Sequence, residues 1–347
     1  MKTIQLVAVF GLTVAALSGC GPRRPVLHVY IWDDYLDPGL IAGFERLHDC
    51  RVKIDTFDSN ETMYAKVKTG KTGYDIIVPS SYQASLMARN NMLRRIDMAL
   101  LPNVTLNFDD SFQNVVLDPK MTYSVPFAFS FTGIAYRKDK IGGAVLDSWA
   151  CFDNPAFAGH ISLLGDYRET IGAALKFLGY SLNTTASGEL QKAKEVILCW
   201  KKNITKFDNE NYKKNIVSGE LRVVHGYNSD ILQVMILDEE NIGFAFPKEG
   251  FAVACDEMVI PVTAKESGLA HAFINFLYDP DNACRNMQYT CAPMPNRQGL
   301  ARLPENFRDS PALLPFPEII AKAETITDVG EANDLYLKIW DEITAEE

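Results

Sequence analysis

The chain has 347 residues, of which 47% are hydrophobic and 22% are charged, and 34 Lys and Arg against 44 Asp and Glu give a formal net charge of −10. This length suggests about two domains with sizeable cores, and the composition excludes a disordered chain. The acidic balance argues against a nucleic-acid-binding protein, which needs basic surface, and it permits cationic ligands without proving one.

Residues 1–19 are predicted to be a secretory signal peptide, because Lys2 precedes a short apolar stretch and small residues follow before Cys20. The apolar stretch is shorter than the ~20 residues that span a membrane. The segment LSGC resembles a bacterial lipobox, whose cysteine becomes lipidated after cleavage; the alternative is a plain signal with an incidental cysteine. We expect a lipidated Cys20, a tether over residues 20–25, and a mature chain of net charge −11, since the signal removes one lysine.

Six cysteines follow Cys20, and an exported compartment permits disulfides between them. Six cysteines allow 15 pairings, and the sequence does not choose among them. No CxxC pair and no Cys/His cluster at metal-ligand spacing occurs, so we expect no metal site. The six are Cys50, Cys151, Cys199, Cys255, Cys284 and Cys291.

The first part of the mature chain alternates between strand and helix patterns. Strands are predicted over 26–32, 52–57 and 74–78, because these short runs are rich in apolar, β-branched and aromatic residues. Helices are predicted over 39–48 and from an N-cap at Ser59 to about residue 69. This order implies parallel strands joined by right-handed crossovers.

The same alternation continues to the C-terminus without a linker or a break in composition. We therefore expect two α/β lobes between which the backbone crosses more than once, near 130–133 and near 251–255, with hinge closure on a ligand. Further strands are predicted over 131–136, 160–164, 223–227, 242–246 and 257–262, and further helices over 170–178, 189–200, 267–278 and 331–343, with one more between 227 and 242.

Aromatic and acidic residues follow several predicted strands, where open α/β sheets bind their ligands. An ammonium ion on an aromatic face gains roughly 0.5–2 kcal/mol, and carboxylates add charge-assisted hydrogen bonds. The pattern therefore suits an organic ammonium ligand. The residues are Trp32, Asp33 and Tyr35 after the first strand, Tyr82 after the third, Asp166 and Glu169 after 160–164, and Tyr227 at the end of 223–227.

Each position also has a purely structural interpretation. Asp166 and Glu169 match a capping box at a helix start, and the aromatic residues suit an ordinary core. Asp33 suits a solvated turn, and Asp256 suits the solvated start of a strand. No GxSxG, GxGxxG, GxxxxGK[ST] or HExxH motif occurs, and no second acid is placed opposite Asp166 and Glu169 as in a glycosidase, so we expect neither an enzyme nor a cofactor.

The chain resembles the spermidine/putrescine-binding proteins of bacterial ABC importers from about residue 26 to the C-terminus. The segment SNETMYAK before YDIIVPSSY is the most specific part of this likeness. The resemblance implies a periplasmic-binding-protein fold: two lobes, each a mostly parallel sheet flanked by helices and each built from discontinuous segments, with a ligand cleft between them. The similar segments are YIWDDYLDPGL (30–40), FDSNETMYAKVKTGKTGYDIIVPSSY (57–82), YSVPF (123–127), FPKEG (246–250), PMPN (293–296) and DVG (328–330).

We expect the lobes to comprise 26–131 plus 256–299 and 132–255 plus 300–347. The resemblance further implies a lipid-anchored periplasmic monomer that binds a polyamine and delivers it to an ABC permease, with no chemistry on the ligand and no nucleic acid.

Position by position, the resemblance places aromatic walls on the first lobe and carboxylates on the second. The walls are Trp32, Tyr35 and Tyr82, and the carboxylates are Asp166 and Glu169. On the same basis, Tyr227 stands where relatives often have Trp, and Asp256 matches the carboxylate that meets an inner or distal amine. Asp33 is an extra acid where relatives often have a hydroxyl residue.

The chain also departs from the family pattern. Ala254 and Ala292 replace a cleft Trp and a cleft Tyr of close relatives, and Ile326 replaces a polar amide. We therefore expect a wider slot, and the alternative ligand is another organic cation such as agmatine or arginine. Because Cys255 and Cys291 adjoin the two alanines, we hypothesise that they pair; two buried free cysteines are the alternative.

Overall fold

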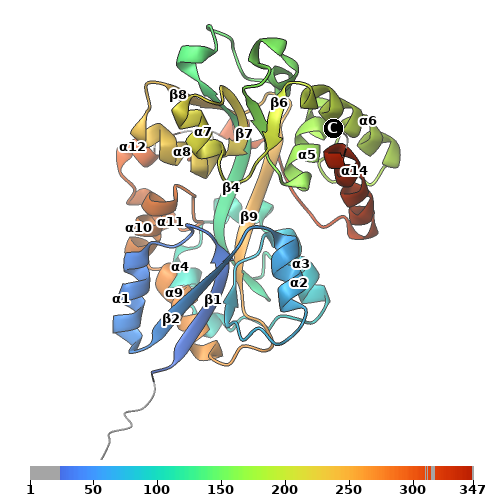
Figure 1. Cartoon of the computed structure of the whole chain (residues 1–347). Helices are drawn as coiled ribbons and strands as arrows, with labels where there is room; N and C mark the ends of the chain where they lie inside the picture. The colour runs from blue at the N-terminus through green and yellow to red at the C-terminus, as the bar shows by residue number, and fades with distance from the viewer. Residues whose placement is uncertain (1–23, 309, 311, 314–316, 346–347) are drawn as a thin grey trace, which may run out of the picture.

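The computed structural model describes residues 24–308, 310, 312–313 and 317–345. Two lobes lie one above the other, and two long strands, β4 (Ser124–Arg137) and β9 (Phe251–Val259), run through both (Figure 1). The predicted signal peptide and Cys20 lie outside the described residues. Within the described part of the chain, no helix is both long enough and apolar enough to cross a membrane.

The first lobe, the lower one in Figure 1, begins with three parallel strands. β1 (Val26–Trp32) pairs with β2 (Arg51–Phe57) from Val26 opposite Arg51 to Trp32 opposite Phe57, and with β3 (Ile76–Ile77) on its other side. Its helices are α1 (Pro38–His48), α2 (Asn60–Val67), α3 (Ser81–Arg89), α4 (Pro102–Asn107), α9 (Ser267–Leu277) and α10 (Pro280–Thr290).

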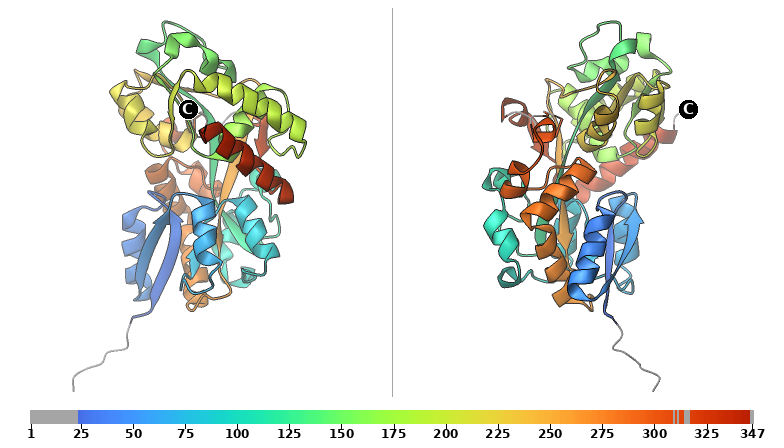
Figure 2. Two further views of the ribbon diagram at one scale, coloured as in Figure 1. Left: turned by 45° about the vertical axis from the view of Figure 1, so that its right-hand side comes forward. Right: turned by 90° about the vertical axis from the view of Figure 1, so that its left-hand side faces the viewer.

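The second lobe lies above the first and carries the parallel strands β5 (Ile161–Leu163), β6 (Ile204–Phe207) and β7 (Val223–Tyr227). Figure 2 shows α14 (Asn333–Ala345) across this lobe, where it packs on α5 (Tyr167–Phe177) and α6 (Ser187–Lys201). The other elements of this lobe are β8 (Ile242–Ala245), α7 (Tyr212–Ser218) and α8 (Asn228–Leu237).

The remaining described elements are short. They are β10 (Ala323–Thr325), α11 (Arg297–Ala301), α12 (Glu305–Arg308), α13 (Pro317–Ile320) and the 3-10 helices Met98–Leu100, Asp110–Val115, Lys138–Lys140, Trp149–Asp153, Pro155–Phe157 and Gly330–Ala332.

One continuous sheet links the lobes, with the strand order β2-β1-β3-β9-β4-β7-β5-β6. β4 pairs antiparallel with β9 as far as Phe131 opposite Val253, and then with β7 from Thr132 opposite Tyr227. β4 thus changes partner within 130–133, where the sequence predicted a crossing. The predicted strands were too short here, because β4 begins seven residues and β9 six residues earlier than expected.

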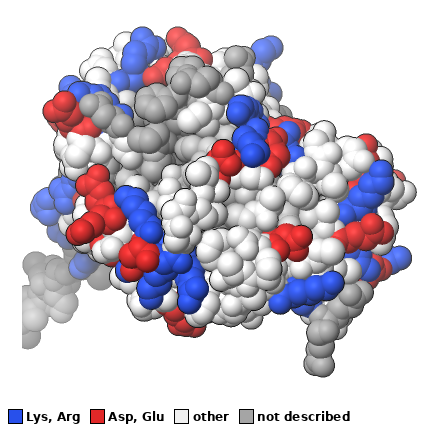
Figure 3. Space-filling model, turned by 90° about the horizontal axis from the view of Figure 1, so that it is seen from above, with Lys and Arg blue, Asp and Glu red and all other residues white. Residues whose placement is uncertain are grey.

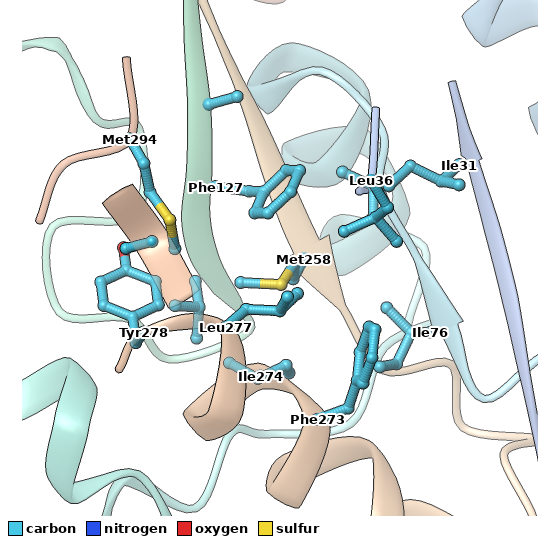
Figure 4. Close-up of a cluster of buried hydrophobic side chains, with 14 of the residues drawn as sticks. Ile31, Leu36, Ile76, Phe127, Met258, Phe273, Ile274, Leu277, Tyr278 and Met294 are labelled. Carbon is cyan, nitrogen blue, oxygen red and sulfur yellow. The ribbon is translucent and has the colours of Figure 1, made fainter. Parts of the chain in front are cut away.

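Each lobe has a hydrophobic cluster of its own. In the first lobe, Phe127, Met258 and Phe273 lie among apolar side chains from the sheet and from α9 (Figure 4). In the second lobe, the cluster includes Trp149, Phe152 and Trp200. Cys291 packs in the first cluster and Cys255 in the second, and neither forms a disulfide. The hypothesis that these two cysteines pair is therefore wrong, because their side chains belong to different cores.

Charges of both signs are distributed over the face seen from above (Figure 3). Lys and Arg side chains alternate there with Asp and Glu, so this face is not dominated by one sign. The excess of acidic residues in the chain therefore does not form a continuous acidic patch on this face.

Candidate functional site

The carboxyl ends of the parallel strands of both lobes meet where β4 changes partner. Trp32 ends β1, Tyr82 follows β3, Asp166 follows β5, and Tyr227 ends β7. Because sheets bind ligands beyond these ends, the topology brings residues from distant parts of the chain to one place.

Asp256 lies on β9 and exposes only 5% of its surface. Its Oδ2 accepts a hydrogen bond of 2.7 Å from the Tyr35 hydroxyl, and its Oδ1 accepts one of 2.8 Å from the Ser80 hydroxyl. Burial raises the pKa of Asp256 to about 6, and these bonds oppose that rise because they favour the charged form. The solvated position that its place in the sequence suggested is therefore wrong.

Trp32 and Tyr35 stand beside this carboxylate. The Trp32 ring packs on Phe57 with ring centroids 4.4 Å apart, and its buried indole Nε1 has no hydrogen-bond partner. That N–H is near enough to Asp256 to favour its charged form. The ring of Tyr35 lies 6.1 Å from that of Phe127. Two aromatic side chains and one carboxylate thus form one end of the group.

Asp166 and Glu169 form the other end, at the start of α5. Asp166 is the N-cap, and its Oδ1 accepts from the backbone N–H groups of Arg168 at 2.8 Å and Glu169 at 3.2 Å. Glu169, which exposes 4% of its surface, accepts a hydrogen bond of 2.9 Å from the Thr132 hydroxyl. The capping role predicted for Asp166 is confirmed, whereas Glu169 bonds to β4 instead of to the helix start.

Electrostatics link the two ends. Burial, followed by the charge of Asp166, raises the pKa of Glu169 to about 8, and Asp256 contributes to that rise. Burial also raises the pKa of Asp166. The pKa of the Tyr227 hydroxyl is well above its usual value because of burial and the charges of Asp166, Glu169 and Asp256. The charges of all three carboxylates therefore act on the Tyr227 hydroxyl.

Arg168 is buried next to these acids but directs its guanidinium elsewhere. Nη1 donates to the carbonyl of Thr327 at 3.0 Å, and Nη2 donates to Asn183 at 2.9 Å. The guanidinium also lies over the ring of Tyr336, 4.8 Å from its centroid. Among the described residues, no Lys or Arg forms an ion pair with Asp166, Glu169 or Asp256. The charge of Arg168 favours the ionised forms of Asp166 and Glu169, but no ion pair with these acids is formed.

Tyr82 lies between the lobes. Its hydroxyl accepts a 3.0 Å hydrogen bond from Asn60, which also bonds to Ser80. Its ring packs against a small apolar cluster of Leu182, Ala252 and Ile326. Asn60, Ser80 and Thr132 donate hydrogen bonds to the predicted site residues Tyr82, Asp256 and Glu169. They were not predicted from the sequence because nothing in their local pattern distinguishes them from ordinary capping and strand residues.

Three positions singled out from the sequence remain to be described: Asp33, Ala254 and Ala292. Asp33 is exposed on the turn after β1 and, within the described contacts, makes no hydrogen bond or ion pair with the other predicted site residues. Ala254 is half-buried opposite Ser130, and Ala292 is buried after α10. In the described ranges, no three His, Cys, Asp or Glu side chains are arranged to hold a metal ion.

The fold and this buried group define a two-lobe solute-binding protein. The family described as bacterial extracellular solute-binding protein matches residues 39–315, and the chain belongs to this family. The fold is the periplasmic-binding-protein fold of its structural neighbours.

Several relatives match nearly the full length. The spermidine/putrescine-binding periplasmic protein of Escherichia coli is 32% identical over 98% of each chain. The spermidine/putrescine-binding periplasmic protein 1 of Haemophilus influenzae is 32% identical over 92% of this chain and 89% of its own. The solved TpPotD lipoprotein of Treponema pallidum has a TM-score of 0.84 and 33% identity, covering 92% of this chain and 99% of that one.

Proposed function

We propose that the chain is the polyamine-binding component of an ABC importer. The observation that carries this proposal is the group of three carboxylates, the buried Glu169 and Asp256 and the half-buried Asp166. Their hydrogen bonds come from hydroxyl and backbone N–H groups and not from a Lys or Arg side chain. Removing such charges from water is costly unless a cation is added. The names of the relatives, which include spermidine/putrescine-binding proteins, support a polyamine as that cation.

The arrangement suits a flexible chain with amines at both ends. One ammonium group would meet Asp166 and Glu169, and another would meet Asp256. The methylenes between them would lie along Trp32, Tyr35, Tyr82 and Tyr227, since aromatic faces favour both apolar chains and cations. Such a role needs binding and release only, and no covalent step.

A second candidate ligand is another organic cation, such as agmatine or arginine. The observation in its favour is that small or apolar side chains, Ala254, Ala292 and Ile326, stand where the resemblance implies bulky or polar ones. Ile326 packs in the cluster that Tyr82 contacts, so it borders the group directly. A ligand with a planar guanidinium would fill more space at that border than a primary amine.

The proposed role also requires two lobes that can close and an anchor at the membrane. We propose lobes of 26–131 plus 256–299 and 132–255 plus 300–347, which close over the ligand by bending at β4 and β9. The bound form would be presented to a membrane permease by a monomer anchored in the periplasm through a lipid on Cys20. The segment after residue 300 also packs on the first lobe, because Leu303 and Leu313 belong to the first hydrophobic cluster.

A ligand panel tests the proposal. Putrescine, spermidine, spermine, agmatine and arginine would each be added in a thermal-melting experiment, since a ligand that binds only the folded form raises the melting temperature. Isothermal titration would then compare the wild type with the double variant D166N/E169Q. Asparagine still caps α5 and glutamine still accepts from Thr132, so the double variant is expected to fold.

We expect the double variant to lose at least about 100-fold in affinity, because each charge-assisted hydrogen bond contributes roughly 1.5–3 kcal/mol. The matched control is E195Q/E305Q, which removes two exposed carboxylates from α6 and α12. Equal affinities of D166N/E169Q and wild type would contradict the assignment.

A further inference from the structure

Glu61 lies at the rim of the buried carboxylate group and was not among the residues predicted from sequence. It occupies the first turn of α2, in the first lobe, and it is exposed to solvent. Its Oε1 lies 3.5 Å from the hydroxyl of Tyr167, which belongs to α5 in the second lobe. Glu61 is thus a carboxylate of one lobe in contact with the other lobe.

The charge of Glu61 faces the charge of Asp166 across the boundary between the lobes. Burial raises the pKa of Glu61, and Asp166 raises it further. Conversely, the charge of Glu61 raises the pKa of the Tyr82 and Tyr167 hydroxyls more than any other charge does, and the charge of Asp166 raises both as well. Two carboxylates from two lobes therefore act on the same pair of tyrosines.

No described Lys or Arg forms an ion pair with Glu61 or Asp166. The charge of Arg168 lowers the pKa of Asp166, but its guanidinium bonds to Thr327 and Asn183. On the α14 side, Tyr167 donates to Asn333 at 2.9 Å, which is a neutral contact. The ion pair of Arg89 with Asp328 joins α3 to the segment after β10 and engages neither carboxylate. Closure of the lobes therefore brings like charges together, and no described Lys or Arg forms an ion pair with either of them.

We propose that Glu61 is a further ligand-binding residue, which holds one terminal ammonium group of the ligand together with Asp166 and thereby makes closure of the lobes depend on that cation. This inference rests on the proposed function. A cation between two carboxylates replaces their repulsion by two attractions. The ligand acts as the missing counter-ion between the lobes.

The geometry also specifies the kind of cation. An ammonium group carries three N–H donors, which is enough for Glu61, Asp166 and Glu169. A quaternary ammonium ion has no donor and would leave the carboxylates without hydrogen bonds. Because Asp256 remains for a second ammonium group, the site selects a primary diamine or a longer polyamine over a monoamine and over a quaternary ion.

The test compares E61Q with wild type, with E195Q as the control that removes one exposed carboxylate from α6. Isothermal titration with putrescine measures affinity, and choline serves as the quaternary ammonium probe. Small-angle X-ray scattering of the ligand-free proteins measures how compact they are. The conservative variant E61D and the variant Y167F separate the charge of Glu61 from its contact with Tyr167.

We expect E61Q to bind putrescine at least about tenfold more weakly, because one charge-assisted contact is lost. Without ligand, E61Q should be more compact than wild type, since the repulsion with Asp166 is gone. E195Q and Y167F should behave as wild type in both measurements, E61D should retain most of the affinity, and choline should not bind.

Wild-type affinity and an unchanged scattering profile for E61Q would overturn the inference while leaving polyamine binding intact. A wild-type protein that binds no diamine at all would overturn the proposed function and this inference together. An affinity loss that is equal in E61Q and E195Q would also contradict it, since only long-range charge would then be at work.

Discussion

The hydroxyl of Tyr35 donates a hydrogen bond of 2.7 Å to Asp256, which lies 221 residues further along the chain. This bond joins the loop after β1 to β9, and it favours the ionised carboxylate. Tyr35 would therefore both contact the ligand with its ring and favour the ionised form of the carboxylate that the ligand would meet.

Replacing Tyr35 with Phe tests this relationship. Without the hydroxyl, the pKa of Asp256 should rise above its value of about 6, so that more of it is protonated at neutral pH. We expect Y35F to bind putrescine roughly tenfold more weakly at pH 6.5, with a smaller deficit at pH 8.5, where Asp256 is ionised in both proteins. Titration calorimetry at both pH values measures this, and a deficit that is the same at both would show that Tyr35 acts only through packing.

Ligand binding should depend on pH through Glu169. Its pKa of about 8 means that it is largely protonated at neutral pH without ligand, whereas a bound ammonium ion favours the charged form. We expect affinity to rise from pH 6 to pH 9 and binding at pH 7 to release protons. Calorimetry in two buffers with different ionisation enthalpies counts those protons. E169Q should abolish most of the release, and proton uptake on binding would contradict the prediction.

The same carboxylate should destabilise the ligand-free protein. Because the folded protein holds the Glu169 proton up to about pH 8 while the unfolded chain loses it near pH 4.5, the Glu169 contribution to stability falls as pH rises between these values. E169Q should therefore melt at a higher temperature than wild type at pH 8 without ligand, yet gain less from added putrescine. A lower melting temperature for E169Q at that pH would indicate that the Thr132 contact dominates.

His225 should limit stability in acid. It is fully buried, both ring nitrogens lack hydrogen-bond partners, and the ring of Trp149 meets it edge-on at 4.9 Å. Burial lowers its pKa from 6.5 to about 3, so protonation favours the unfolded chain as pH falls below 6.5. On this basis His225 costs about 3 kcal/mol at pH 4 relative to pH 7.

H225F should reduce this acid sensitivity, which urea unfolding at pH 7 and pH 4 would measure. H48Q, at an exposed position on α1, is the control and should unfold with the pH dependence of wild type. Loss of stability between pH 7 and pH 4 that is identical in H225F and wild type would assign the acid sensitivity to other groups.

The cysteines should differ sharply in reactivity. Cys199 is exposed, whereas the other five described cysteines are buried and all six are free. Burial also raises the pKa of Cys291 to about 12, which disfavours the reactive thiolate. We expect one rapid alkylation in the folded protein, at Cys199, and the variant C199S should lack it. After unfolding, all six of these cysteines should react as free thiols. A disulfide found by mass mapping of the unreduced protein would contradict this.

The sequence was informative where local patterns carry the information. The strand 223–227 and the strand 26–32 match the structure at both ends, since their apolar runs are bounded by turn residues. The antiparallel pairing of β4 with β9 was not predictable, because their partners lie more than a hundred residues away. Asp166 was found through its helix-start pattern, whereas Glu61 carries no local signal and acts only through the approach of Tyr167 from the other lobe.

The strand order has a consequence for how the molecule is made. β3, which ends at Ile77, pairs with β9, which ends at Val259, so the sheet of the first lobe lacks its central strand until most of the chain has been synthesised. Neither lobe can therefore complete its core early. The complete sheet, which runs through both lobes, can therefore form only after β9 has been synthesised.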